Sequence, residues 1–181
     1  LVSLPEYQDI LRGYRKEKEE GRRVVLTPNV MEYRRLESAF SSASGKNGTE
    51  DASSSSLEEA LEGTIIIQKG HYDTITAPSS STKSVRICKE MGGLKRSGGI
   101  GDVLAGTLGA FVAWNNILNP QNNNNKEGEE CHEDGSTDDW MMLSCWSACC
   151  VVKKATKSAF EKKRRAMTAP DVLEEIGSVV E

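Results

Sequence analysis

A run of glycines that leads into an apolar helix is the feature that most constrains this chain. Residues 92–102 read Gly-Gly-Leu-Lys-Arg-Ser-Gly-Gly-Ile-Gly-Asp, and residues 102–118 are almost wholly apolar. Glycine permits backbone conformations that other residues avoid, so successive amide N–H groups can converge on one anion. The start of a helix adds free N–H groups and a positive dipole end. The sequence therefore predicts a phosphate-binding loop at residues 92–101.

Asp102 lies at the start of that helix, where the positive end of the helix dipole stabilises a carboxylate. Beside a bound phosphate, this carboxylate could take the proton from an attacking hydroxyl during phosphoryl transfer. Lys95 and Arg96 supply positive charge for the phosphate oxygens. On this motif alone, an ordinary helix N-cap after a flexible loop is an equally good interpretation, because glycine-rich motifs also match by chance.

The remaining pattern favours an α/β fold, with a parallel sheet flanked by helices. Residues 22–27 and 64–68 are predicted strands, and residues 30–39 between them repeat apolar positions at helical spacing. Strands with continuous apolar runs are typical of a parallel sheet covered by helices. Residues 73–77 and 84–88 are rich in β-branched residues and are predicted to form a hairpin.

Several other segments are predicted to be helices. The helix from residue 102 to 118 is expected to be buried, because it is apolar on all sides. In the last helix, Thr168 is a favourable N-cap, Pro170 suits a first turn and Asp171 suits the positive helix end. The predicted helical segments are residues 1–20, 57–61, 102–118, 140–160 and those after Thr168.

Two low-complexity stretches are predicted to be surface insertions, because they are too polar to fold alone. Residues 38–56 are rich in serine, and residues 119–139 are rich in asparagine and acids. The second stretch has seven acids and one lysine, so it accounts for more than the whole net charge of −4. The rest is only slightly basic, which argues against a nucleic-acid binder. With no apolar run near the ~20 residues that a bilayer requires, the chain is not expected to cross a membrane.

The five cysteines predict a reducing compartment rather than a disulfide framework, since their number is odd. Cys131 and His132 with Cys145, Cys149 and Cys150 do not match a standard metal-binding spacing, so no protein metal site is predicted. Cys145 and Cys149 instead share the predicted inward stripe of a helix. The basic residues at 153–157 and 162–165 are interpreted as a solvated helical face.

Three motifs in order resemble the NAD(P)H-hydrate dehydratases, a family of ribokinase-like fold. They are Leu-Thr-Pro-Asn-Val-Met-Glu-Tyr-Arg-Arg-Leu at 26–36, Ile-Gln-Lys-Gly-His-Tyr-Asp at 67–73 and Gly-Gly-Ile-Gly-Asp-Val-Leu-Ala-Gly at 98–106. The resemblance covers nearly the whole chain, residues 1–181, outside the two insertions. Because the family's domain is about twice as long, the chain is expected to be its C-terminal half, and independent catalysis is not expected.

The resemblance implies a lyase that dehydrates the S form of hydrated NADH or NADPH. ATP, with ADP as the alternative, would phosphorylate the ring hydroxyl, and elimination of phosphate would restore the reduced cofactor. Mg²⁺ is expected on the nucleotide phosphates rather than in a protein cage. The family further implies a functional link to an NAD(P)H-hydrate epimerase and leaves a homo-oligomer open. The expected compartment is the cytoplasm, with the mitochondrion as the alternative.

The resemblance also assigns site residues by their place in the motifs. Asp102 would be the general base and would face the substrate. The substrate segment is expected to comprise Asn29, Val30, Met31, Glu32, Tyr33, Arg34 and Arg35. The nucleotide segments are expected to comprise Lys69, Gly70, His71, Tyr72 and Asp73, and Gly92, Gly93, Leu94, Lys95, Arg96, Ser97, Gly98, Gly99, Ile100 and Gly101.

Two other interpretations remain open at this point. A small-molecule kinase of the same fold, acting on a vitamin-precursor alcohol, would share the glycine loop and Asp102. The motif at residues 26–36 argues against it, because that pattern belongs to the dehydratases. The other alternative is a non-catalytic remnant that binds nucleotide. Individually, His71 is equally well a solvated loop histidine, and Glu32 an ordinary surface glutamate.

Overall fold

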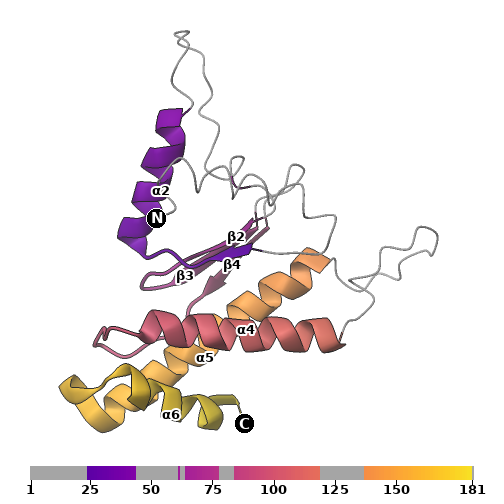
Figure 1. Cartoon of the computed structure of the whole chain (residues 1–181). Helices are drawn as coiled ribbons and strands as arrows, with labels where there is room; N and C mark the ends of the chain where they lie inside the picture. The colour runs from indigo at the N-terminus through magenta and orange to yellow at the C-terminus, as the bar shows by residue number, and fades with distance from the viewer. Residues whose placement is uncertain (1–23, 44–60, 62–63, 78–83, 119–136, 181) are drawn as a thin grey trace. The chain divides into compact units, whose positions relative to one another are not determined.

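The computed structural model describes residues 24–43, 61, 64–77, 84–118 and 137–180 (Figure 1). The helix predicted at residues 1–20, nearly all of the one at 57–61, and Cys131 with His132 lie outside these residues. The chain forms two compact units, each described by itself below. The first holds β1, α2, β2, most of β3 and the start of β4. The second holds His71–Asp73 and the chain from Ile87 onward.

The sheet has four strands in the order β1-β2-β3-β4: Val24–Leu26, Thr64–Gln68, Asp73–Ala77 and Ser84–Cys88. β1 and β2 run parallel, which confirms the parallel pair predicted on either side of a helix. β2 and β3 run antiparallel, with Ile67 opposite Ile75. The sheet is therefore mixed rather than wholly parallel, because the short turn after β2 sends the chain straight back along its neighbour.

Helix α2, Val30–Ala43, packs its apolar stripe on residues of the first two strands. Leu36 and Phe40 form a buried cluster with Leu61 and Ile66. The helix continues past Ser38, where the sequence predicted an insertion to begin, so this boundary was wrong. Burial of Phe40, which is 2% exposed, stabilises the turn beyond Ser38, since a large apolar side chain gains about 1.5–3 kcal/mol on burial.

Three helices and a short 3₁₀ turn make up most of the second unit. They are α4 (Ile100–Leu118), α5 (Thr137–Lys163), η3 (Arg164–Ala166) and α6 (Ala169–Val180), and α5 contacts both α4 and α6 (Figure 1). The start of α5 at Thr137 also shortens the second predicted insertion, which ran to residue 139. The core between the helices is Ala155, Ala159, Met167 and Val172, with Ile100 and Val103 packed against it.

The cysteines of α5 are buried, as the predicted inward stripe required. Cys145 and Cys149 are fully buried, with Val152, Ala155 and Ala159 along the same face. Burial raises the pKa of the Cys145 thiol to about 12 and raises that of Cys149 as well. Cys88 and Cys150 lie with their sulfurs 3.4 Å apart as free thiols. The prediction of core cysteines is confirmed for Cys145 and Cys149.

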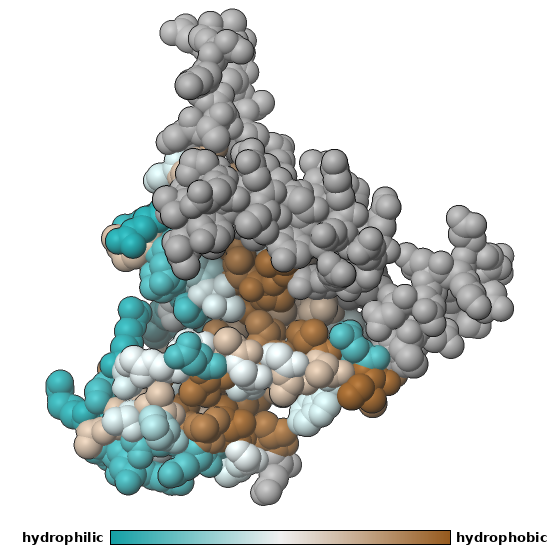
Figure 2. Space-filling model, viewed as in Figure 1, coloured by the Kyte–Doolittle hydropathy of each residue, from teal (hydrophilic) through white to brown (hydrophobic). Residues whose placement is uncertain are grey.

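The predicted burial of residues 102–118 was wrong. Of α4, only Leu104, Leu108 and Asn115 are buried. Trp114 is 51% exposed, and Leu118 is 78% exposed at the C-terminal end. Figure 2 shows pale and brown surface along this helix. One face of α4 packs on α5 and α6, and composition alone cannot say how many faces of an apolar helix meet a neighbour. Within the described ranges, no helix combines the length and apolar character needed to span a bilayer.

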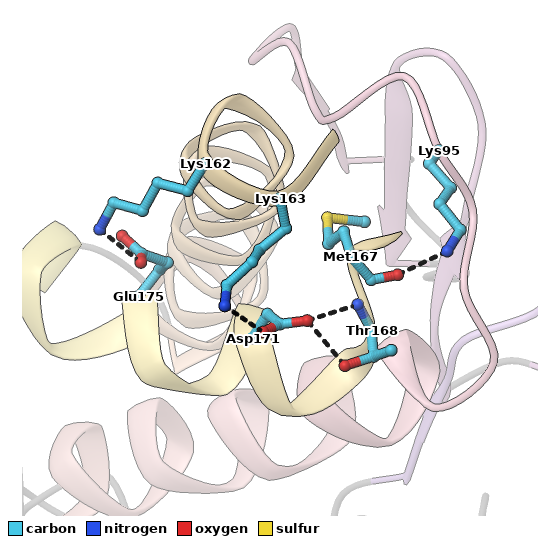
Figure 3. Close-up of polar contacts among 7 residues, drawn as sticks. All are labelled: Lys95, Lys162, Lys163, Met167, Thr168, Asp171 and Glu175. Atoms are coloured by element: carbon cyan, nitrogen blue, oxygen red, sulfur yellow. Dashed lines mark hydrogen bonds and ion pairs between the residues drawn. The ribbon is translucent and has the colours of Figure 1, made fainter. Parts of the chain in front are cut away.

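The start of α6 is fixed by Thr168 and Asp171, as predicted. The Thr168 N–H and hydroxyl both donate to Asp171 Oδ2, each at 2.7 Å (Figure 3). These two hydrogen bonds, with Lys163 at 3.9 Å, lower the pKa of Asp171. The carboxylate at the third helical position thus satisfies the N-cap N–H, as in a capping box.

Glu175 joins α6 to α5. The Lys162 ammonium donates to Glu175 Oε1 and the Ser158 hydroxyl to Oε2, both at 2.6 Å. Both hydrogen bonds favour the charged carboxylate, so they lower the pKa of Glu175 from its usual 4.5. This carboxylate is buried in the fold, while Lys162 reaches it from the exposed end of α5 (Figure 3).

Glu175 gives a prediction about pH. A carboxylate whose pKa is lowered on folding stabilises the fold above its unfolded pKa, and that stability is lost as pH falls through the folded pKa. We expect the melting temperature of the Glu175→Gln variant to lie below that of the parent at pH 7, with the gap closing below pH 4.5. Thermal unfolding from pH 7 to pH 3 measures it, with Glu174→Gln as control. A gap that is constant with pH would contradict the assignment.

Arg164 gives a prediction about backbone strain. Its φ is 51°, and in the described part of the chain it is the one residue other than glycine with a positive φ. A residue with a side chain loses about 1–2 kcal/mol of stability in the left-handed region. Glycine avoids this loss, but its greater entropy in the unfolded state offsets part of the gain. We expect Arg164→Gly to raise the free energy of unfolding by about 0.5–1 kcal/mol, measured by denaturant titration. Arg165→Gly, without that backbone conformation, should lower it. Equal effects at both positions would refute this reason.

Candidate functional site

The predicted substrate segment begins with a reciprocal cap on α2. The Asn29 side-chain oxygen accepts hydrogen bonds from the N–H groups of Met31 and Glu32, at 2.9 and 3.0 Å. The Glu32 carboxylate in turn accepts the Asn29 N–H at 2.7 Å. The three-residue spacing of Asn29 and Glu32 is thus that of a capping box, which fixes where the helix starts. The interpretation of Glu32 as an ordinary surface residue therefore misses this contact.

The other members of this segment divide by exposure. Tyr33 packs against the cluster of Leu36 and Phe40, so most of its ring serves the core. The remaining predicted contacts are exposed on the helix, namely Val30, Met31, Arg34 and Arg35. Asn29 and Glu32 are exposed as well, and their hydrogen bonds hold the turn that presents these four side chains.

The first two motifs meet at one edge of the sheet. Asn29 and Lys69 form a β-bridge, and the Lys69 N–H donates to the Pro28 carbonyl at 2.9 Å. Both residues follow the carboxyl ends of the parallel strands β1 and β2. Ligands of open α/β sheets bind outside the carboxyl ends of the parallel strands. The structure therefore brings Asn29, Lys69 and Gly70 to the edge where a ligand is expected.

The segment His71–Asp73 is tied to α5 by a lysine that the sequence analysis placed on a solvated face. The Lys153 ammonium donates to the His71 carbonyl at 2.6 Å and lies 3.4 Å from Asp73 Oδ1. The side chains of Lys153 and Asp73 are 13% and 7% exposed. The solvated interpretation is therefore wrong for Lys153. The rings of His71 and Tyr72 are exposed, with centroids 4.6 Å apart.

The start of the glycine loop lies directly on α5. A Cβ at Gly93 would lie 2.4 Å from the Thr156 carbonyl oxygen and 2.9 Å from the Phe160 Cβ. The Gly93 N–H donates to the Thr156 hydroxyl at 3.2 Å, and that hydroxyl donates to the Lys153 carbonyl at 2.7 Å. At Gly92 the nearest atom to a Cβ would be the same hydroxyl, at 3.1 Å. Packing thus excludes a side chain at Gly93, whereas a Cβ at Gly92 would make only a tight contact with this hydroxyl.

The end of the loop rests on the start of α6. The Lys95 ammonium donates to the Met167 carbonyl at 2.6 Å (Figure 3). Gly99 has a φ of 87°, and a Cβ there would lie 2.9 Å from that of Ala169. Its carbonyl accepts the N–H groups of Asp102 and Val103, at 3.0 and 3.1 Å. Lys95, predicted to meet phosphate, is engaged by a carbonyl here.

Asp102 occupies the first turn of α4 and is exposed. On either side of it in the sequence, Ile100 and Val103 pack into the core of the second unit, which fixes the turn that carries the carboxylate. The outer side of the loop is open to solvent. Its exposed members are Leu94, Arg96, Gly98 and Gly99, while Ser97 and Gly101 are half-buried.

A groove of about 650 Å³ lies beside the loop, on the outer side of α5. It is lined by Met91 and Trp146 and by charges of both signs, such as Lys154 and Glu90, which pair at 3.7 Å. Of these residues only Lys154 was predicted from the sequence to lie on a surface, as part of the basic face at 153–157. Because its charges are mixed, the groove shows no preference for phosphate. In the described ranges, no group of three histidine, cysteine or acidic side chains could hold a metal ion.

A glycine-rich loop that leads into a helix N-terminus is typical of α/β proteins that bind a phosphate-bearing ligand. A family model described as NAD(P)H-hydrate dehydratase matches residues 9–178. The chain therefore belongs to the NAD(P)H-hydrate dehydratase family, as the three motifs indicated.

Three relatives share the name ATP-dependent (S)-NAD(P)H-hydrate dehydratase. The one from Mycosarcoma maydis is 34% identical over 187 residues, covering 100% of this chain and 49% of its own length. That from Saccharomyces cerevisiae is 32% identical over 178 residues, covering 96% and 50%. That from Mus musculus is 31% identical over 156 residues, covering 86% and 41%. The chain spans about half the length of the curated relatives it matches.

Two glycines of the loop, Gly93 and Gly98, differ in the space around them, and this allows the packing at Gly93 to be tested. Gly93→Ala should lower the free energy of unfolding by about 1–3 kcal/mol, because its Cβ would meet the Thr156 backbone. At Gly98 a Cβ meets nothing within 4 Å, so Gly98→Ala should change stability by less than about 0.5 kcal/mol. Urea unfolding of both variants measures the difference. A Gly93→Ala variant as stable as the parent would show that the loop does not lie this close to α5.

Proposed function

We propose that this protein acts in the ATP-dependent dehydration of the S form of hydrated NADH or NADPH. The observation that carries the proposal is the turn at Gly99, which opens α4 and places the exposed Asp102 in the first helical turn. The names of its relatives supply the reaction. We also propose that an NAD(P)H-hydrate epimerase supplies the S form, because the relatives' names specify that isomer.

The chemistry proposed for Asp102 is general-base catalysis. Its carboxylate would accept the proton of the hydroxyl on the hydrated nicotinamide ring as the oxygen attacks the terminal phosphorus of ATP. The bond from that phosphorus to the bridging oxygen breaks, which releases ADP. Loss of the ring phosphate with a ring proton then restores the double bond, so that the products are NAD(P)H, ADP and inorganic phosphate.

The residues proposed to hold ATP are those of the two nucleotide segments. Free N–H groups at the start of α4 suit a phosphate, and Arg96, exposed on the loop, provides a cation. Lys69 would add a second positive charge. For Lys95 to contribute, its ammonium would have to leave the Met167 carbonyl, so we assign it to holding the loop.

Mg²⁺ fits this donor set only as a partner of the nucleotide. Such an ion would be held mainly by phosphate oxygens and water. When bound, it would neutralise charge on the phosphates. The substrate is proposed to meet the exposed side chains of α2, among which Arg34 and Arg35 suit the phosphates of a dinucleotide.

The test replaces Asp102 with asparagine in the full-length protein. We expect Asp102→Asn to lower the rate at which NADH absorbance returns from hydrated NADH with ATP by about 10²–10⁴-fold. The melting temperature should change little, because asparagine also suits a helix start. Glu174→Gln, on the exposed side of α6, should keep the parent rate.

Two results would count against the proposal. An Asp102→Asn variant as fast as the parent would remove Asp102 from the role of general base. A parent protein that leaves hydrated NADH unchanged and phosphorylates a vitamin-precursor alcohol would replace the dehydratase with a kinase.

A further inference from the structure

We infer that Lys153 is a positioning residue that fixes the backbone of the nucleotide segment His71–Asp73 against α5. The role for nucleotide rests on the proposed function, whereas the anchoring itself rests on geometry alone. Lys153 belongs to none of the sequence motifs, and the sequence does not distinguish it from Lys154, the next residue. In the structure the two lysines have different contacts.

The contacts of Lys153 reach the segment at two points. Its ammonium donates to the main-chain carbonyl of His71 at 2.6 Å and lies 3.4 Å from a carboxylate oxygen of Asp73. A main-chain contact and a side-chain contact two residues apart restrain both the position and the direction of the turn between them. That turn carries the exposed rings of His71 and Tyr72.

The burial of the Asp73 and Lys153 side chains explains why residue 153 carries a charge. The Asp73 and Lys153 side chains are 7% and 13% exposed, so removal of either would break a nearly buried ion pair. A hydrogen bond from a charged donor is also stronger than one from a neutral donor. The ammonium therefore holds the His71 carbonyl more firmly than a neutral side chain would.

The same stretch of α5 also supports the glycine loop. The Lys153 carbonyl accepts the Thr156 hydroxyl, which in turn accepts the Gly93 N–H. A Cβ at Gly92 would lie 3.8 Å from Lys153 Cγ. One residue of α5 thus contacts His71–Asp73 through its side chain and is linked to the glycine loop through its carbonyl. The two proposed nucleotide segments therefore share one support.

The experiment compares Lys153→Met with Lys154→Met in the full-length protein. Lys154 is the matched control, because its side chain is 54% exposed and pairs with the exposed Glu90 at 3.7 Å. Hydrogen–deuterium exchange of peptides that cover His71–Asp73 measures directly how firmly this segment is held. Titration with Mg²⁺-ATP measures the effect of the anchor on nucleotide affinity.

We expect Lys153→Met to speed exchange in His71–Asp73 and to weaken Mg²⁺-ATP binding, each by about tenfold or more, since a charged hydrogen bond is lost. Lys154→Met should leave both near the parent values. Lys153→Arg, which keeps a cation, should recover part of each. If Lys153→Met fails to fold, the double variant Asp73→Asn with Lys153→Met removes both buried charges and should show the same faster exchange and weaker binding.

The two ways of failing can be told apart. Parent-like exchange and affinity in Lys153→Met, or in the double variant, would overturn the inference even if the parent binds ATP. A parent that does not bind Mg²⁺-ATP would overturn the proposed function, and with it the role of this anchor in nucleotide binding. In that case the exchange data still decide whether Lys153 holds the segment.

Discussion

The main chain at Gly93 lies so close to the main chain of α5 that no side chain fits between them. A Cβ at this position would sit 2.4 Å from a backbone oxygen, which cannot move aside as a flexible side chain would. From this contact the loop continues to Gly99 and then to the first turn of α4. Because backbone contacts are stiff, the contacts with α5 and α6 fix the course that the glycines of the loop permit. The placement of Asp102 depends on that course.

The first unit positions its motif residues by a different constraint. Two parallel strands end side by side, so the residues that follow them, Asn29 and Lys69, come to the same edge and pair through a bridge. The capping contacts of Asn29 and Glu32 then start α2 at once, which leaves Met31, Arg34 and Arg35 exposed beyond the sheet. Asn29 and Glu32 therefore fix the turn from which these side chains project.

Local signals in the sequence were sufficient for some elements and insufficient for others. The cap at Thr168 and the buried cysteine stripe were predicted correctly, because each depends on residues within a few positions of one another. Lys153 was misassigned, because its partner Asp73 lies on another element and no local pattern marks the pair. The exposure of α4 was missed for a related reason. An apolar sequence indicates that a helix tends to be buried. The rest of the fold determines how many faces of that helix contact a neighbouring element. The roles of Asp102 and of the motif residues stay predictions, since contacts within the chain do not test what they bind.

The supports of the glycine loop lie far along the chain from the loop itself. Gly93 and Thr156 are 63 residues apart, and Lys95 and Met167 are 72 apart. Contacts over such separations close large loops and form late compared with helical turns. A ribosome therefore makes the loop well before it makes the helices that shape it. Throughout that interval the loop lacks the contacts that define its course, so competence to bind phosphate would arise only when α5 and α6 have been made and have docked.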